Sequence, residues 1–229
     1  MKVRNHMAII RNLRNITSAG VSKNHIAKLK RAFADGSWST SRILPFRYIA
    51  SARHNPDWEP ELEQAMFQSL AGMPKLPGLT VLLVDVSGSM DAPIGGKSEL
   101  SRRDAAYALG MLAREICEDV RIYTFSDNAK KVPNRRGFAL RDAMNTNQSH
   151  GGTYLGQAIT QIDKTENYDR LIIFTDEQTA DKVGNPKGTS YLVNVASNRN
   201  GVGYKGNFVH IDGFSSSVID WIKVYEDLD

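Results

Sequence analysis

The chain has 229 residues, of which 41% are hydrophobic and 24% charged, which is ordinary for a globular protein with a buried core. At roughly 100–200 residues per domain, this length allows one domain or two. No uninterrupted apolar run is long enough to cross a membrane or to act as a secretory leader, so we expect no membrane partner. The single cysteine, Cys117, excludes an internal disulfide framework, indicates a cytoplasmic location and is expected to lie inside a helix.

The charge is divided unevenly along the chain. Residues 1–54 carry eleven Lys or Arg and one acid, a net charge of +10, whereas the whole chain carries +4 and the remainder therefore −6. Such asymmetry is typical of a polyanion-binding arm joined to an acidic body, although solvated helix faces can also produce it. The candidate RNA-binding cations are Arg11, Arg14, Lys23, Lys28, Lys30, Arg31, Arg47 and Arg53.

Residues 1–75 show the periodicity of short helices. Apolar residues recur at helical spacing from Ile9 to Ile16, and Ser22 can cap a second helix that ends near Gly36. A third helix is expected to start near Pro45, and the run PDWEPELEQAMFQSLAG predicts a fourth. We therefore expect an all-helical segment that resembles the end of a helical-repeat ring and closes at a Pro- and Gly-containing join.

From residue 79 the pattern changes to strands that alternate with helices. The run LTVLLVDV (79–86) is almost continuously apolar, as expected for a strand that is buried on both faces. A helix over residues 100–118 follows, and further strands are expected at 120–126, 170–176, 189–197 and 207–214. The sequence therefore predicts that residues 79–229 form an α/β domain with a doubly wound, mostly parallel, Rossmann-like sheet.

Three of the predicted loops contain oxygen-bearing side chains. Asp85, Ser87 and Ser89 follow the first strand, Thr153 follows two glycines before a helix, and Asp176 ends a later strand. The carboxyl ends of parallel strands meet at one edge of the sheet, so these side chains can converge. An all-oxygen set of carboxylates and hydroxyls suits Mg²⁺ or another hard divalent cation. Ordinary helix capping and turn chemistry are the alternative roles for the same residues.

The same loops argue against an enzyme. A magnesium phosphohydrolase usually has a second acid two positions after the first, and Ser87 occupies that position here. The histidine nearest to the three loops, His150, lies beside two glycines, where a solvated side chain is expected more often than a catalytic base. We therefore expect no catalytic residues in this chain.

The five oxygen-bearing positions resemble the metal-ion-dependent adhesion site of the von Willebrand factor A domain family, over residues 79–229. The resemblance implies that Asp85, Ser87, Ser89 and Thr153 approach the metal directly or through water, and that Asp176 acts mainly through water. The flanking runs RILPFRYIASARHN and HIDGFSSSVIDWIKVY are similar to segments of the Ro autoantigen family, whose helical-repeat module is called TROVE.

In the Ro family a ring of helical repeats binds small noncoding Y RNAs and the single-stranded ends of misfolded RNAs, and an A domain closes the ring. Only 75 or so residues precede the A domain here, so we do not expect this chain to close such a ring alone. The resemblance implies a non-enzymatic, RNA-associated, metal-binding interaction module. The alternative is an A domain whose Mg²⁺ captures an Asp or Glu of a protein partner, without RNA. Phe46 and Tyr48 could stack on bases or belong to a helix core.

Overall fold

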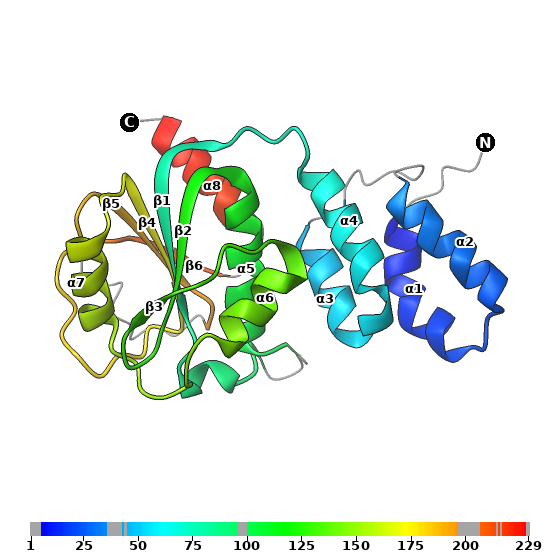
Figure 1. The fold of residues 1–229 in the computed structure, drawn as a ribbon, viewed down its shortest axis with the longest axis horizontal. Helices are drawn as coiled ribbons and strands as arrows, with labels where there is room; N and C mark the ends of the chain where they lie inside the picture. Colours follow the sequence, from blue (N-terminus) through cyan, green and yellow to red (C-terminus); the bar gives the residue numbers. More distant parts are fainter. Residues whose placement is uncertain are drawn as a thin grey trace. The chain divides into compact units, whose positions relative to one another are not determined.

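The computed structural model describes residues 6–35, 43, 45–95, 100–196, 207–213, 215 and 217–227. The chain divides into two separately packed units, Met1–Met73 and Pro74–Asp229. Figure 1 shows helices in the first unit and a sheet with flanking helices in the second. Each unit is described by itself.

The described part of the first unit is helical. Its elements are α1 (His6–Ser18), α2 (Lys23–Ala34), α3 (Phe46–His54), the short 3-10 helix η1 (Pro56–Trp58) and α4 (Glu59–Leu70). One apolar face of each α-helix is buried, and the fully buried side chains include Leu13, Phe33, Tyr48 and Leu62. Phe33 packs edge-on against Trp58, with ring centroids 6.1 Å apart. Burial of these faces against one another holds the short helices together, because isolated helices of this length are marginal in water.

The second unit contains a six-stranded sheet. Its strands are β1 (Leu76–Asp85), β2 (Cys117–Phe125), β3 (Ala129–Lys131), β4 (Arg170–Thr175), β5 (Thr189–Asn194) and β6 (Val209–Asp212). The strand order is β3-β2-β1-β4-β5-β6, and every pairing is parallel except that of β2 with β3 at the edge. The doubly wound, mostly parallel α/β fold expected from the sequence is therefore confirmed.

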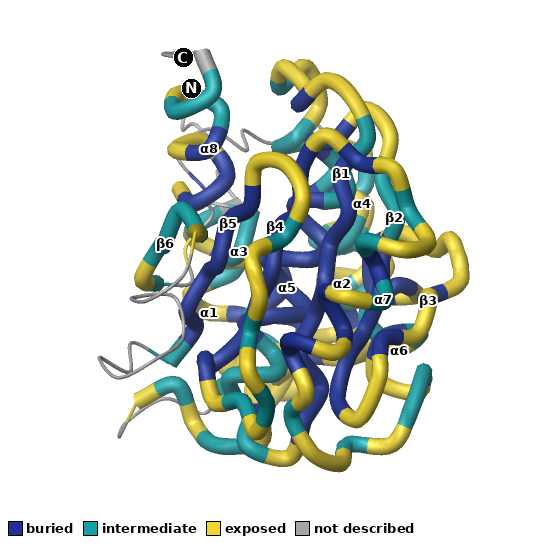
Figure 2. Tube along the Cα trace, turned by 90° about the vertical axis from the view of Figure 1, so that its left-hand side faces the viewer, coloured by how far each residue is buried: buried dark blue, intermediate teal, exposed yellow. Residues whose placement is uncertain are grey.

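Helices cover both faces of this sheet. They are α5 (Arg102–Ile116), α6 (Gly137–Thr146), α7 (Leu155–Thr165) and α8 (Ser217–Asp227), and the short 3-10 helix η2 (Gly88–Asp91) lies in the turn after β1. Figure 1 shows α7 on one side of the sheet and α5 and α8 on the other. Central strands enclosed in this way are buried over most of their length, as the dark blue traces of β1, β4 and β5 in Figure 2 show. Across the described residues, the helices are all too short or too polar to span a membrane.

Alternate residues of the central strands pack on opposite helices. Val81 and Leu83 of β1 belong to a cluster with Leu155 and Ile159 of α7. On the opposite face, Arg170 of β4 donates to the Thr80 hydroxyl at 2.9 Å and forms a two-point ion pair with Glu226 of α8. Successive side chains of β1 point to opposite faces of the sheet, and helices cover both faces. Nearly every residue of the strand is therefore apolar.

Three details differ from the sequence-based expectations. Cys117 is the first residue of β2 rather than part of a helix, because its backbone pairs with Leu76 and this pairing ends α5 at Ile116. Strand β1 begins at Leu76 rather than residue 79, with an irregular register around Pro77 and Gly78. The connector after β2 contains the short antiparallel strand β3. Propensity alone did not reveal these features, since strand pairing at a distance decides them.

Candidate metal centre and basic helices

Asp85 is the last residue of β1, and its side chain has no exposed surface. One carboxylate oxygen accepts a hydrogen bond from the Ser87 backbone at 2.9 Å, and the other accepts one from the Thr175 hydroxyl at 2.6 Å. Thr175 ends the neighbouring strand β4. The carboxylate is therefore held between the ends of two parallel strands, at the sheet edge where the sequence places it.

Ser87 and Ser89 present their hydroxyls to each other. The two Oγ atoms lie 3.2 Å apart, across the turn that leads from β1 into η2. Ser87 is buried and Ser89 is half-buried. Two adjacent hydroxyl oxygens beside a buried carboxylate form part of an all-oxygen ligand set.

The loop that carries Thr153 lies against both neighbouring loops. The Gly88 backbone donates to the Gly151 carbonyl at 3.2 Å, which joins this loop to the turn after β1. The Thr153 carbonyl accepts from the Ala180 backbone at 2.8 Å and from the Thr179 hydroxyl at 3.2 Å, which joins it to the segment after β4. All three predicted loops thus meet at one edge of the sheet.

Asp176 is also fully buried, and no local sequence pattern indicates its principal partner. Arg102, at the start of α5, donates from Nη1 to Asp176 Oδ2 at 2.7 Å, and the Gln178 backbone donates to Oδ1 at 3.2 Å. Ser101 and Asp104 form a capping box that fixes the first turn of α5. This capping box fixes where α5 begins, and Arg102 is the first residue of the helix.

A second arginine reaches the same loops. Arg103 Nη2 donates to the Ser87 carbonyl at 3.3 Å, and its Nη1 lies 2.7 Å from the Asp91 carboxylate. The Nε atoms of both Arg102 and Arg103 are buried without a hydrogen-bond partner. The rim of the site therefore combines buried carboxylates with partly buried guanidinium groups.

Burial controls the electrostatics of the site. It raises the pKa of Asp85 to about 7, an effect that hydrogen bonds from Ser87 and Thr175 oppose and the nearby Asp176 carboxylate adds to. Buried carboxylates of this kind are usually paired with a cation or coordinate a metal. Two buried carboxylates and the adjacent hydroxyls of Ser87 and Ser89 offer only oxygen donors, which fit a hard divalent cation such as Mg²⁺.

His150, the one candidate base considered from the sequence, is engaged elsewhere. Its ring Nε2 lies 3.1 Å from the Asn145 carbonyl of α6. The imidazole therefore contacts the end of a helix.

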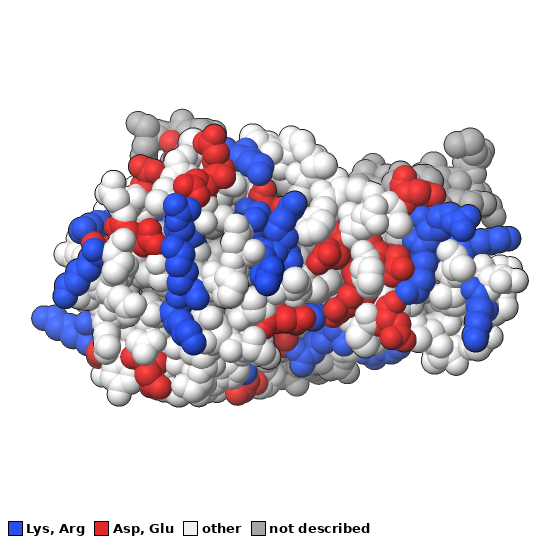
Figure 3. Space-filling view, viewed as in Figure 1, with Lys and Arg blue, Asp and Glu red and all other residues white. Residues whose placement is uncertain are grey.

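The eight candidate RNA-binding cations lie on α1, α2 and α3. Seven of them are exposed: Arg11, Arg14, Lys23, Lys28, Arg31, Arg47 and Arg53. Lys30 is less exposed, and its Nζ atom has partners within the unit. Nζ lies 3.2 Å from the Glu61 carboxylate, donates to the Asp57 carbonyl and lies 5.3 Å from the centroid of the Trp58 ring. On the face drawn in Figure 3, Lys and Arg gather over α1 and α2 and acids gather over α4. Because Lys30 is only partly exposed and its ammonium group is already engaged, it is a weaker candidate for binding phosphate.

The two aromatic residues of α3 have different environments. Tyr48 is fully buried, and Phe46 is half-buried. Burial raises the pKa of the Tyr48 hydroxyl above its ordinary value. Tyr48 therefore belongs to the helix core and cannot stack on a base without local unfolding.

The family model of the Ro60 von Willebrand factor A domain matches residues 80–189, which include all five candidate metal ligands. These residues are therefore similar to the A domain of Ro60 proteins. The match runs from the middle of β1 to the start of β5, so it includes Asp85 at the end of β1 and Asp176 directly after β4. No curated protein sequence matches the chain.

A solved structure shares the fold of this chain. The crystal structure of the Deinococcus radiodurans Ro (RSR) protein is 19% identical, covers 90% of this chain and superposes with a TM-score of 0.66. The match covers 49% of that protein, so this chain spans about half its length. An aerotolerance-related membrane protein from Bacteroides fragilis is 15% identical over 52% of this chain and 67% of its own, with a TM-score of 0.43. Proximal thread matrix protein 1 from the mussel byssus is 12% identical. The match covers 65% of this chain and 46% of that protein, also with a TM-score of 0.43.

Proposed function

We propose that this chain is a non-enzymatic, RNA-associated interaction module of the Ro type that also binds a divalent metal. The observation that carries the proposal is the set of seven exposed Lys and Arg residues on α1, α2 and α3, in a chain that also carries a Ro60-type A domain. Small noncoding or single-stranded RNA is the ligand class that the Ro resemblance implies. The lone free thiol, Cys117, supports a cytoplasmic location.

The basic helices would contact RNA mainly through its phosphates. Arg11 and Arg14 are three residues apart on α1, and Lys28 and Arg31 are three apart on α2, so each pair shares a helix face. Exposed cations at this spacing neutralise phosphates with little sequence discrimination. Binding of this kind releases counterions and must therefore weaken as salt rises.

In this proposal the metal is held by Asp85, Ser87, Ser89 and Thr153, directly or through water. Asp176 would act through water, which is supported by the Arg102 guanidinium on its Oδ2 atom. Hydroxyls are neutral and leave most of the charge of Mg²⁺ uncompensated, so the ion would attract a carboxylate or phosphate from a partner or brace the loops of the domain.

The decisive experiment measures binding of a fluorescent single-stranded RNA to the full chain over a range of salt concentrations. We expect affinity to fall linearly on a log–log plot, with a slope of about −0.7 for each phosphate contacted. The combined variant Arg11→Gln, Arg14→Gln, Lys28→Gln and Arg31→Gln should bind about tenfold more weakly and show a shallower slope.

The matched control removes the same charge from the A domain. The variant Lys75→Gln, Lys130→Gln, Lys164→Gln and Lys182→Gln replaces four exposed lysines and should leave both affinity and slope nearly unchanged. RNA binding that is absent at low salt, flat with salt, or equally reduced by both variants contradicts the proposal.

A protein-binding A domain without RNA activity is the second candidate. Arg102 and Arg103 favour it, because their guanidinium groups lie at the rim of the metal centre and suit an incoming carboxylate. In that case a chelator and Asp85→Asn abolish binding of an acidic protein partner, whereas the variant of the basic helices binds that partner normally.

A further inference from the structure

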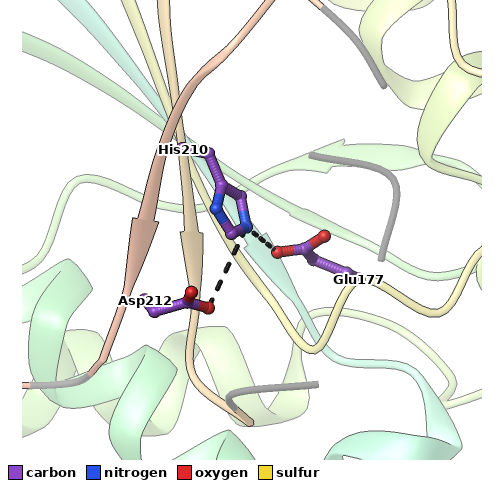
Figure 4. Close-up of side chains that lie close together, drawn as sticks. All are labelled: Glu177, His210 and Asp212. Atoms are coloured by element: carbon purple, nitrogen blue, oxygen red, sulfur yellow. Dashed lines mark hydrogen bonds and ion pairs between the residues drawn. The ribbon is translucent and has the colours of Figure 1, made fainter. Parts of the chain in front are cut away.

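A second group of metal-ligating side chains lies near the first, on different residues. It consists of Glu177, which follows β4, with His210 and Asp212 of β6 (Figure 4). His210 and Asp212 are two positions apart on a strand and therefore share one of its faces. One ligand atom from each of the three residues lies within 4.8 Å of the others.

The backbone at Glu177 directs its side chain into this group. Among the described residues it is the one non-glycine with a positive φ, at 62°, and its N–H donates to the Thr175 hydroxyl at 3.0 Å. A non-glycine residue rarely occupies this region unless its surroundings hold it there. The turn sends two consecutive carboxylates to different partners, since Asp176 contacts Arg102 and Glu177 contacts His210.

The donor atoms are spaced closely enough for a single ion. His210 Nε2 is hydrogen-bonded to Glu177 Oε1 and lies 4.0 Å from Asp212 Oδ1. A tetrahedral zinc ion with bonds of about 2.0–2.2 Å separates its ligand atoms by about 3.4 Å. Small side-chain rotations would therefore bring all three atoms to coordinating positions.

The donor chemistry differs from that of the first centre. One imidazole nitrogen and two carboxylate oxygens suit a borderline transition-metal ion, whereas the oxygen-only set around Asp85 suits Mg²⁺. Two carboxylates also balance the charge of a divalent ion. The Glu177 side chain is fully buried, while that of Asp212 is 44% exposed, which provides access from solvent.

We propose that Glu177, His210 and Asp212 bind a divalent transition-metal ion of the zinc class, with water as the fourth ligand. The ion would link the loop after β4 to β6, and β5 separates these two strands in the sheet. Because Glu177 directly follows Asp176, the second ion would also stabilise the loop that carries one residue of the first centre. This inference does not depend on RNA binding.

The test titrates the full chain with Co²⁺, a spectroscopic substitute for Zn²⁺, in excess Mg²⁺ that saturates the first centre. We expect one Co²⁺ per chain with the intense visible absorption of tetrahedral coordination, and loss of that absorption when Zn²⁺ is added. Asp212→Asn and His210→Gln should each weaken Co²⁺ binding by about tenfold or more.

Asp220→Asn, at an exposed acid of α8, is the matched control and should bind Co²⁺ as the wild type does. Because Asp212 is partly exposed, its substitution should leave the thermal unfolding of the metal-free protein unchanged, which separates lost ligation from lost folding. Absence of the tetrahedral spectrum in the wild type overturns the proposal. Unchanged affinity in both ligand variants overturns it as well, and the Glu177–His210 contact would then be only a bracing hydrogen bond.

Discussion

At the residue scale, the chemistry of the candidate centre depends on the environment of Asp85. Its carboxylate accepts hydrogen bonds from Ser87 and Thr175, yet burial still raises its pKa to about 7. Two hydrogen bonds thus offset only part of the cost of removing the charge from water. A divalent cation beside the carboxylate would offset more of that cost, and this coupling can be measured as a change in stability.

We expect Mg²⁺ to raise the melting temperature of the wild-type protein but not that of Asp85→Asn. At a concentration of about 100 times the dissociation constant, the ion should stabilise the wild type by about 2.7 kcal/mol. Without Mg²⁺ the variant should be at least as stable as the wild type, because Asn keeps the buried shape without the charge, and its amide nitrogen can donate to the Thr175 hydroxyl instead of accepting from it. Thermal unfolding with and without Mg²⁺ checks both statements.

Asp220→Asn controls for the general effect of removing an acid and should retain the full Mg²⁺ response, since it lies exposed on α8. A Mg²⁺-dependent shift that survives in Asp85→Asn would show that the ion binds elsewhere.

At the element scale, the start of α7 is tied to the segment after β4. The Gly156 and Gln157 backbones donate to the Asp181 carboxylate at 3.1 and 2.7 Å, and the Leu155 backbone donates to the Thr179 hydroxyl at 3.2 Å. These side chains satisfy the free N–H groups of the helix from a segment distant in sequence. The same packing holds the loops of Thr153 and Asp176 against each other.

Gly156→Ala should break this packing. A Cβ atom at residue 156 would lie 2.2 Å from the Lys182 carbonyl oxygen, a backbone atom that can move only with its loop. We expect the free energy of unfolding to fall by about 1–3 kcal/mol, measured by denaturant titration. Gly184→Ala in the same connecting segment is the control, because its Cβ would meet no atom within 4 Å. Equal stability of the two variants would contradict the packing argument.

At the scale of the whole molecule, charge is divided unequally between the two packed units. Met1–Met73 carries eleven Lys or Arg and five acids, a net charge of +6, which leaves −2 for Pro74–Asp229. The acids of η1 and α4 therefore moderate the excess of +10 counted over residues 1–54. The phosphate-binding surface proposed above therefore includes fewer cations than residues 1–54 contain. Lys30, which is paired with Glu61, is not part of that surface.

A protein that starts at Pro74 should fold cooperatively without the helical unit, because the sheet and its flanking helices have their own buried core. We expect a single thermal transition by circular dichroism and a retained Mg²⁺ response. Binding to single-stranded RNA should be lost, since the exposed cations of α1 to α3 are gone. A shortened protein that binds RNA like the full chain would place the RNA site on the A domain.

The Ro60-type fold could be predicted from the sequence because its signals are local. The apolar run of β1, the polar turn after it and the alternation of strands with helices each depend on neighbouring residues. The five proposed metal ligands could be placed at one edge for the same reason, since parallel strands bring their carboxyl ends together whatever the details of packing. Their role in binding metal remains a prediction.

Other features were decided only by the tertiary structure. Arg102 meets Asp176, Lys30 meets Glu61, and His210 meets Glu177, and each pair joins residues far apart in the chain. No periodicity or spacing reports such contacts, because strand order and helix packing set which distant side chains share a buried space. The sequence by itself thus determined most of the helices and strands and the polar turn after β1. Three-dimensional packing determined the ends of β1 and α5, the edge strand β3 and the charge partners of the residues around that turn.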